Sequence, residues 1–135
     1  MVERGVVHMI RKESGQSLVE TALVIPILLI LLVGIIDVGR LLYFYSHIHL
    51  ATQETVRIGG LGKSDNEIIL FAKDYINFEK PELLNITITP TESTRVSGEY
   101  LTVELRYPFE AITPMIDKLI PGPLQVKADS TIRVE

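Results

Sequence analysis

Glu20 is the ionisable side chain whose position most strongly suggests a chemical role. It lies one turn inside the start of a long apolar segment, and no lysine or arginine follows it until Arg40. An ionisable group inside a membrane helix is energetically costly, so it suggests a functional site by default. The alternative is a solvated residue of the first helical turn at the membrane interface, where the helix dipole favours a carboxylate. Glu20 alone is compatible with both interpretations.

Two other groups of residues could in principle carry chemistry. Gly62-Lys63-Ser64 resembles the end of a phosphate-binding loop, but that motif needs a glycine where this chain has Arg57, and a strand leading in where we expect a helix. His47 and His49 are two residues apart, so on a helix they point to different sides, unlike the spacing of four that metal binding uses. We therefore predict no nucleotide site, no metal site and no cofactor. No serine, histidine and carboxylate arrangement stands out, and we expect the protein not to be an enzyme.

The element that must position Glu20 is the apolar run of residues 22–36, which contains no ionisable side chain. Arg11 and Lys12 precede it and indicate that the N-terminus is cytoplasmic. No small-x-small cleavage site follows the run, and the sequence continues into aromatic residues typical of a membrane interface. At about 1.5 Å per residue, a helix over residues 22–45 is about 36 Å long, enough to cross the hydrocarbon core with tilt.

Three further residues of this helix have predictable effects. Asp37 and Arg40 are three residues apart, so they can pair on one face, and we expect them to mark the outer membrane boundary. Pro26 should bend the helix and free one carbonyl, with or without any further role.

The downstream sequence predicts a small α+β domain. The first helix should continue through Ile58 and end at Gly59-Gly60. The capping box Ser64-Asp65-Asn66-Glu67 should open a second helix, which Pro81 closes. From Leu84 the apolar residues alternate with a period of two in three segments, with a possible short helical turn over residues 114–119 before the last. One apolar face per strand indicates a small antiparallel three-stranded sheet packed against a helix.

The expected organisation of the whole chain is a leader over residues 1–15, an anchor with its extended helix over 16–58, and the extracytoplasmic domain over 59–135.

Composition limits the possible functions. The chain has 135 residues, so only one small domain with a modest core can follow the anchor. Cysteine is absent, which excludes disulfides and thiolate metal sites. The net charge is −4 and there is no basic cluster, which argues against nucleic acid as a partner.

The segment from Gly15 to Glu20, followed by a long apolar helix, resembles the processing site of type IV pilin-like proteins. Over residues 15–26, and on through Gly34 to the ending Asp37-Val38-Gly39-Arg40, it is similar to the signature of the TadE-like family, pilin-like components of the tight adherence (Tad) pilus system. The resemblance implies that a membrane prepilin peptidase cuts after Gly15 and that Gln16 becomes the mature N-terminus. It also implies that Glu20 is the carboxylate required for assembly. Many type IV pilins begin with an N-methylated phenylalanine, from which Gln16 departs.

The sequence therefore predicts a non-enzymatic, single-pass, pilin-like minor component of a tight adherence pilus. Its expected partners are the prepilin peptidase, other Tad pilins, assembly-platform membrane proteins and membrane lipid. The alternative is a signal-anchored extracytoplasmic binding module unrelated to pili, which has no need of Gly15. A membrane-tethered hydrolase would need convergent polar residues on the small domain. Either Met1 or Met9 could begin translation, and the protein could enter the filament or stay at its base.

Overall fold

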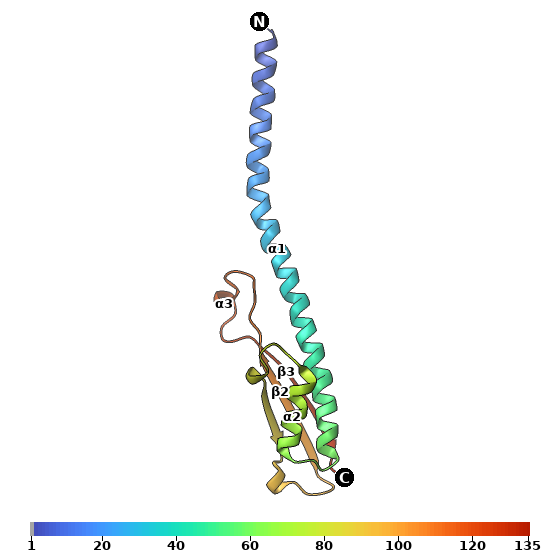
Figure 1. The fold of residues 1–135 in the computed structure, drawn as a ribbon. Helices are drawn as coiled ribbons and strands as arrows, with labels where there is room; N and C mark the ends of the chain where they lie inside the picture. Colours follow the sequence, from blue (N-terminus) through green and yellow to red (C-terminus); the bar gives the residue numbers. More distant parts are fainter. Residues whose placement is uncertain (1) are drawn as a thin grey trace.

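The protein consists of one very long helix with a small α+β unit folded against its C-terminal end (Figure 1). The computed structural model describes the backbone of residues 2–135 and the side chains of residues 14–116 and 118–135. Helix α1 spans Val2–Gly60, and the first half of it projects away from the rest of the chain (Figure 1).

The elements after α1 follow the predicted order. Helix α2 spans Asp65–Ile76, and strands β1 (Asn85–Thr89), β2 (Tyr100–Pro108) and β3 (Gln125–Arg133) form one antiparallel sheet in the order β1-β2-β3. The connections contain the short turns η1 (Pro81–Leu83), η2 (Glu92–Thr94) and α3 (Ile116–Leu119). The α+β class, the second helix and the three-stranded sheet are thus confirmed.

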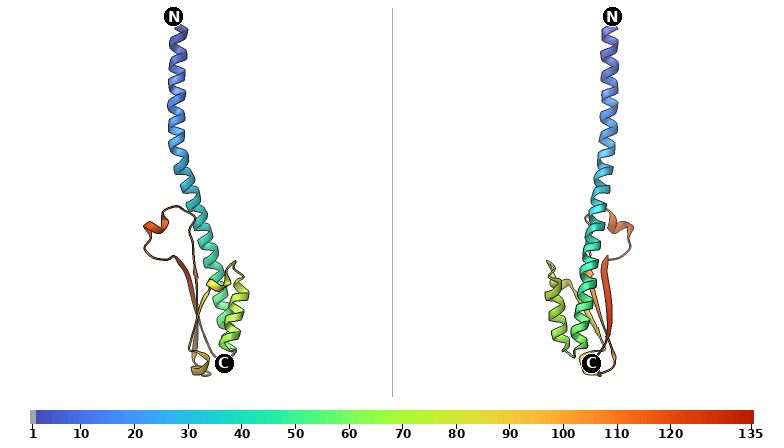
Figure 2. Two further views of the ribbon diagram at one scale, coloured as in Figure 1. Left: turned by 60° about the vertical axis from the view of Figure 1, so that its left-hand side comes forward. Right: turned by 90° about the vertical axis from the view of Figure 1, so that its right-hand side faces the viewer.

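The projecting half of α1 has the character of a membrane span. Its large apolar side chains are exposed over residues 18–42, with Leu23 at 67% and Ile35 at 62%. Within the described part of the chain, α1 is the one helix that is long and apolar enough to cross a membrane. The helix continues through Pro26, and the ribbon changes direction in that part of the helix, where its colour turns from blue to cyan (Figures 1 and 2). This bend agrees with the effect expected of a proline inside a helix.

The C-terminal part of α1 belongs to the core of the small unit. The helical spacing of Ile48, Ala51, Thr55 and Ile58 predicts one inward face; the first three are fully buried and Ile58 is partly buried. Helix α1 packs against α2, β2 and β3 (Figure 2). Along β2 the side chains alternate between buried and exposed, and the inward residues are Leu101, Val103, Leu105 and Tyr107. The same helix is therefore an exposed apolar rod at one end and the main packing partner of the sheet at the other.

The capping box at the start of α2 forms as predicted. Glu67 N–H donates to Ser64 Oγ, and Ser64 N–H donates back to Glu67 Oε2 at 3.1 Å. The hydrogen bond from the Ser64 backbone, helped by hydrogen bonds from the Lys63 and Ser64 side chains, lowers the pKa of Glu67. The stabilisation is thus present at neutral pH and is lost as pH falls through that lowered pKa. Helix α2 ends at Ile76, because Asn77 adopts a left-handed conformation, and Pro81 lies beyond this end as the first residue of η1.

Gly59 lies where α1 meets both α2 and the sheet, so Gly59→Ala should destabilise the small unit. An added Cβ would lie 2.3 Å from Leu101 Cδ2 and 3.2 Å from Ile68 Cδ1, and both side chains are fully buried. We expect a loss of about 1–3 kcal/mol in the free energy of unfolding, measured by denaturant titration. Gly39→Ala is the control, because nothing lies within 4 Å of its added Cβ. Equal stability of the two variants would contradict the close packing at Gly59.

Candidate functional site

The predicted processing and assembly residues lie on the exposed start of α1. Gly15, Gln16 and Glu20 are all exposed, and nothing lies within 4 Å of a Cβ added at Gly15. Gln16 Nε2 donates a hydrogen bond to Glu20 Oε1 at 3.3 Å, one turn along the helix. The structure therefore brings Gln16 and Glu20 together on one face, and the peptide bond between Gly15 and Gln16 lies within continuous helix.

Glu20 carries its charge without a cationic partner from the described side chains. Its hydrogen bond comes from the neutral amide of Gln16, and the basic residue that follows it on α1, Arg40, pairs with Asp37. Because this carboxylate is exposed on the projecting half of α1, it can accept hydrogen bonds from a group outside the chain, such as an amine. Arrangement and exposure thus suit Glu20 to an intermolecular contact.

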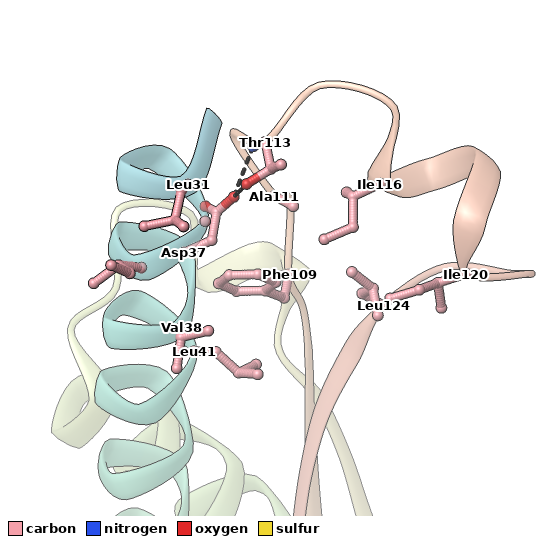
Figure 3. Close-up of a pocket in the computed structure, with 12 residues that line it drawn as sticks. Leu31, Asp37, Val38, Leu41, Phe109, Ala111, Thr113, Ile116, Ile120 and Leu124 are labelled. Carbon is pink, nitrogen blue, oxygen red and sulfur yellow. Dashed lines mark hydrogen bonds between the residues drawn. The ribbon is translucent and has the colours of Figure 1, made fainter. Parts of the chain in front are cut away.

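Among the described side chains of α1, Asp37 makes the most hydrogen bonds, and its main partners come from residues far along the sequence. It is 5% exposed. The backbone N–H of Ile112 donates to Oδ1 and Oδ2, each at 2.9 Å. The N–H and hydroxyl of Thr113 donate to Oδ2 at 2.7 and 2.6 Å, and Figure 3 shows Thr113 beside the Asp37 carboxylate. The carboxylate thereby fixes the connection between β2 and β3 to the middle of α1.

Arg40 completes this anchor point. Its Nη1 donates to Asp37 Oδ1 at 3.1 Å, so the pair predicted from the spacing of three is present. The same nitrogen donates to the carbonyl of Glu110 at 3.1 Å, and the guanidinium carbon lies 5.3 Å from the centre of the Phe109 ring. Arg40 therefore holds the start of the connection at Glu110, while Asp37 holds it two and three residues further on, at Ile112 and Thr113.

An apolar groove opens between α1 and the anchored connection. Its volume is ≈ 570 Å³, and Figure 3 shows side chains of both segments directed into it. Leu31, Ile35 and Val38 line it from α1, and Phe109, Ile116 and Leu124 line it from the other side. Its lining is almost wholly apolar, so it suits an apolar occupant and offers little to a polar substrate.

The comparison with known protein families gives a match within helix α1. Residues 15–57 match the family model described as TadE-like protein. Over this segment the chain is similar to that family. No curated protein and no solved structure matches the chain.

The TadE-like segment contains every site residue that the sequence suggested. It begins at Gly15, includes Glu20, Asp37 and Arg40, and ends within the part of α1 that packs on the sheet. What sequence reasoning missed is the set of donors that Asp37 binds, since Ile112 and Thr113 lie outside the TadE-like segment. The available signal was Asp37 itself, because a carboxylate near the end of an apolar helix needs donors to offset its burial.

The two histidines and the Gly62-Lys63-Ser64 segment, the candidates for metal and phosphate sites, have structural roles. His47 Nδ1 lies 3.1 Å from the carbonyl of Tyr43, whereas His49 contacts Gln53 on another side of the helix. In the described part of the chain, no group of three or more histidine and carboxylate side chains is placed to hold a metal ion. Lys63 pairs with Glu67 beside the capping box, so the Gly-Lys-Ser segment is where α1 ends and α2 begins.

Proposed function

We propose that this TadE-like protein is a single-pass, pilin-like minor component of a tight adherence pilus, cut after Gly15 by a prepilin peptidase. The observation that carries the proposal is the family match, which starts at Gly15 and continues along an exposed apolar helix with Glu20 near its start. The long rod with a small unit at one end suits a subunit whose helix packs among other helices. Its role is assembly, not catalysis.

The proposed topology places residues 1–15 in the cytoplasm and the small unit outside the membrane. Arg11 and Lys12 precede the apolar run, and positive charge beside a span favours the cytoplasmic side. In this orientation the peptidase meets Gly15 at the inner face of the membrane. Other Tad pilins and the assembly platform then meet the projecting half of α1.

Glu20 supplies the assembly contact in this proposal. Cleavage after Gly15 creates a new α-amine at Gln16, and the Glu20 carboxylate of a neighbouring subunit can accept its hydrogen bonds. Inside a membrane or a helix bundle, water screens such a pair weakly, so the charge-assisted bond is stronger than at a protein surface. Pairing of this kind also sets the axial register between adjacent helices.

The processing step is tested by the intact mass and N-terminal sequence of the membrane-extracted protein, from cells with and without their prepilin peptidase. We expect a chain that begins at Gln16 only when the peptidase is present. An uncut chain in both strains, or one cut beyond Ile36, would contradict the proposal. The protein would then be an ordinary anchored or secreted binding module.

Glu20→Gln tests the assembly contact separately from processing. The glutamine keeps the size of the side chain but removes its charge, so we expect normal cleavage after Gly15 and a severe loss of assembled pili, counted by electron microscopy. Glu54→Gln is the control, since Glu54 is a half-exposed carboxylate of the same helix that lies near Arg57. Wild-type piliation with Glu20→Gln would show that Glu20 is only an interfacial residue.

A further inference from the structure

The connection between β2 and β3, residues 109–124, exposes an unusual amount of apolar surface. Ile112, Met115 and Leu119 are 59%, 67% and 79% exposed, and the charged residues after Glu110 are Asp117 and Lys118 alone. Figures 1 and 2 show that this segment leaves the sheet and extends back toward the projecting half of α1. We call it the return loop.

The return loop lies at the depth of the membrane span. It is bound to α1 at Asp37, and the groove it forms reaches Leu31. Glu20 and Asp37 are 17 residues apart, which at 1.5 Å per residue corresponds to about 26 Å of helix, close to the thickness of a hydrocarbon core. With Glu20 at the cytoplasmic interface, Asp37 reaches the outer interface, and the groove beside Leu31 lies within the outer leaflet.

Several backbone N–H groups of the return loop are satisfied within the protein. Irregular chain is tolerated at membrane depth only where its polar groups have partners. Asp37 accepts the N–H groups of Ile112 and Thr113, and the N–H groups of Lys118 and Ile120 bond to carbonyls of the short turn around α3. Three further positions are prolines and have no N–H donor to satisfy: Pro114, Pro121 and Pro123.

We propose that the return loop is a second membrane contact, which inserts its apolar side chains into the outer leaflet beside α1 while lipid acyl chains fill the groove. Lipid fits because the groove is apolar and continuous with the exposed face of the span, at Leu31, Ile35 and Val38. The exposed Lys118 side chain can reach the lipid phosphates while its stem stays in apolar surroundings. This inference rests on the proposed membrane orientation of α1.

Insertion of the return loop would fix the depth and tilt of the small unit. A single span can tilt and rotate in the bilayer and carries the small unit with it, whereas two contacts joined at Asp37 and Arg40 would limit both motions. The loop would thus orient the folded unit before the subunit meets its assembly partners.

The chain contains no cysteine, so single-cysteine variants report directly on insertion. Leu119→Cys probes the return loop, Leu28→Cys probes the span, and Leu70→Cys is the matched control, a leucine of α2 with 68% exposure. Each variant is labelled with an environment-sensitive fluorophore and reconstituted into phosphatidylcholine and phosphatidylglycerol vesicles that contain spin-labelled lipid. We expect quenching at positions 28 and 119 to exceed that at position 70 several-fold.

The outcomes separate the inference from the proposed function. Quenching at position 28 without quenching at position 119 would overturn insertion of the loop and leave the anchor intact. Absence of quenching at both positions would overturn the membrane span as well. If the label at position 119 is not quenched and Leu119→Cys instead cross-links to a second copy, the groove is occupied by another subunit, and the inference is wrong.

Discussion

Gly15→Ala is expected to leave the leader attached in cells that contain an active prepilin peptidase. Glycine lets a backbone approach a partner closely, and an added Cβ at the residue before the scissile bond takes up that space. The substitution should not disturb packing in the folded protein, because no atom lies within 4 Å of the added Cβ. A loss of cleavage would therefore report on recognition by the peptidase rather than on misfolding.

The helical state of the cleavage region adds to this effect. The bond between Gly15 and Gln16 lies inside α1, so a peptidase that binds an extended chain must first unwind the local turns. Glycine is about 1 kcal/mol less favourable than alanine in a helix interior, so Gly15→Ala also makes this unwinding harder. Both contributions oppose cleavage.

The readout for Gly15→Ala is the intact mass of the membrane-extracted chain. We expect the variant to retain residues 1–15 and Gly39→Ala to be processed like the unaltered protein. Gly39 is the matched control because it is an exposed glycine of the same helix with no atom within 4 Å of its added Cβ. Cleavage of Gly15→Ala at the normal rate would remove Gly15 from the recognition site and favour an anchored module unrelated to pili.

The parts of the fold that could be predicted from the sequence are those specified by residues close together in the chain. The Ser64 and Glu67 capping box is complete within four residues, and the alternation of Leu101 and Val103 with polar neighbours marks strand and buried face together. The pair of Asp37 and Arg40 is equally local, since a spacing of three on a helix is enough to predict it.

The return loop could not be predicted, because its position depends on contacts between distant residues. Ile112 and Thr113 lie 75 and 76 residues from Asp37, and each donates through a backbone N–H that any residue except proline supplies. The segment between Pro108 and Leu124 has no periodicity that would indicate which side faces α1. The local sequence marked Asp37 as a boundary residue, and only the fold identifies the loop that it binds.

Asp37→Ala is expected to release the return loop from α1 while the rest of the small unit stays folded. The variant leaves the N–H groups of Ile112 and Thr113 and the Thr113 hydroxyl without their acceptor, and Arg40 without its anionic partner. A donor left without a partner costs about 1–3 kcal/mol, so we expect the free energy of local opening to fall by about 2–4 kcal/mol.

Hydrogen exchange in detergent micelles measures this release at the amides of Ile112 and Thr113, which should lose protection in Asp37→Ala. Amides of β2 should keep theirs, since the core formed by Leu101, Val103 and Leu105 does not include Asp37. Asp74→Ala, at an exposed position of α2, is the control for removal of a negative charge. Unchanged protection at Ile112 would show that apolar packing in the groove, rather than the Asp37 carboxylate, holds the loop. The carboxylate would then be dispensable for positioning the second membrane contact.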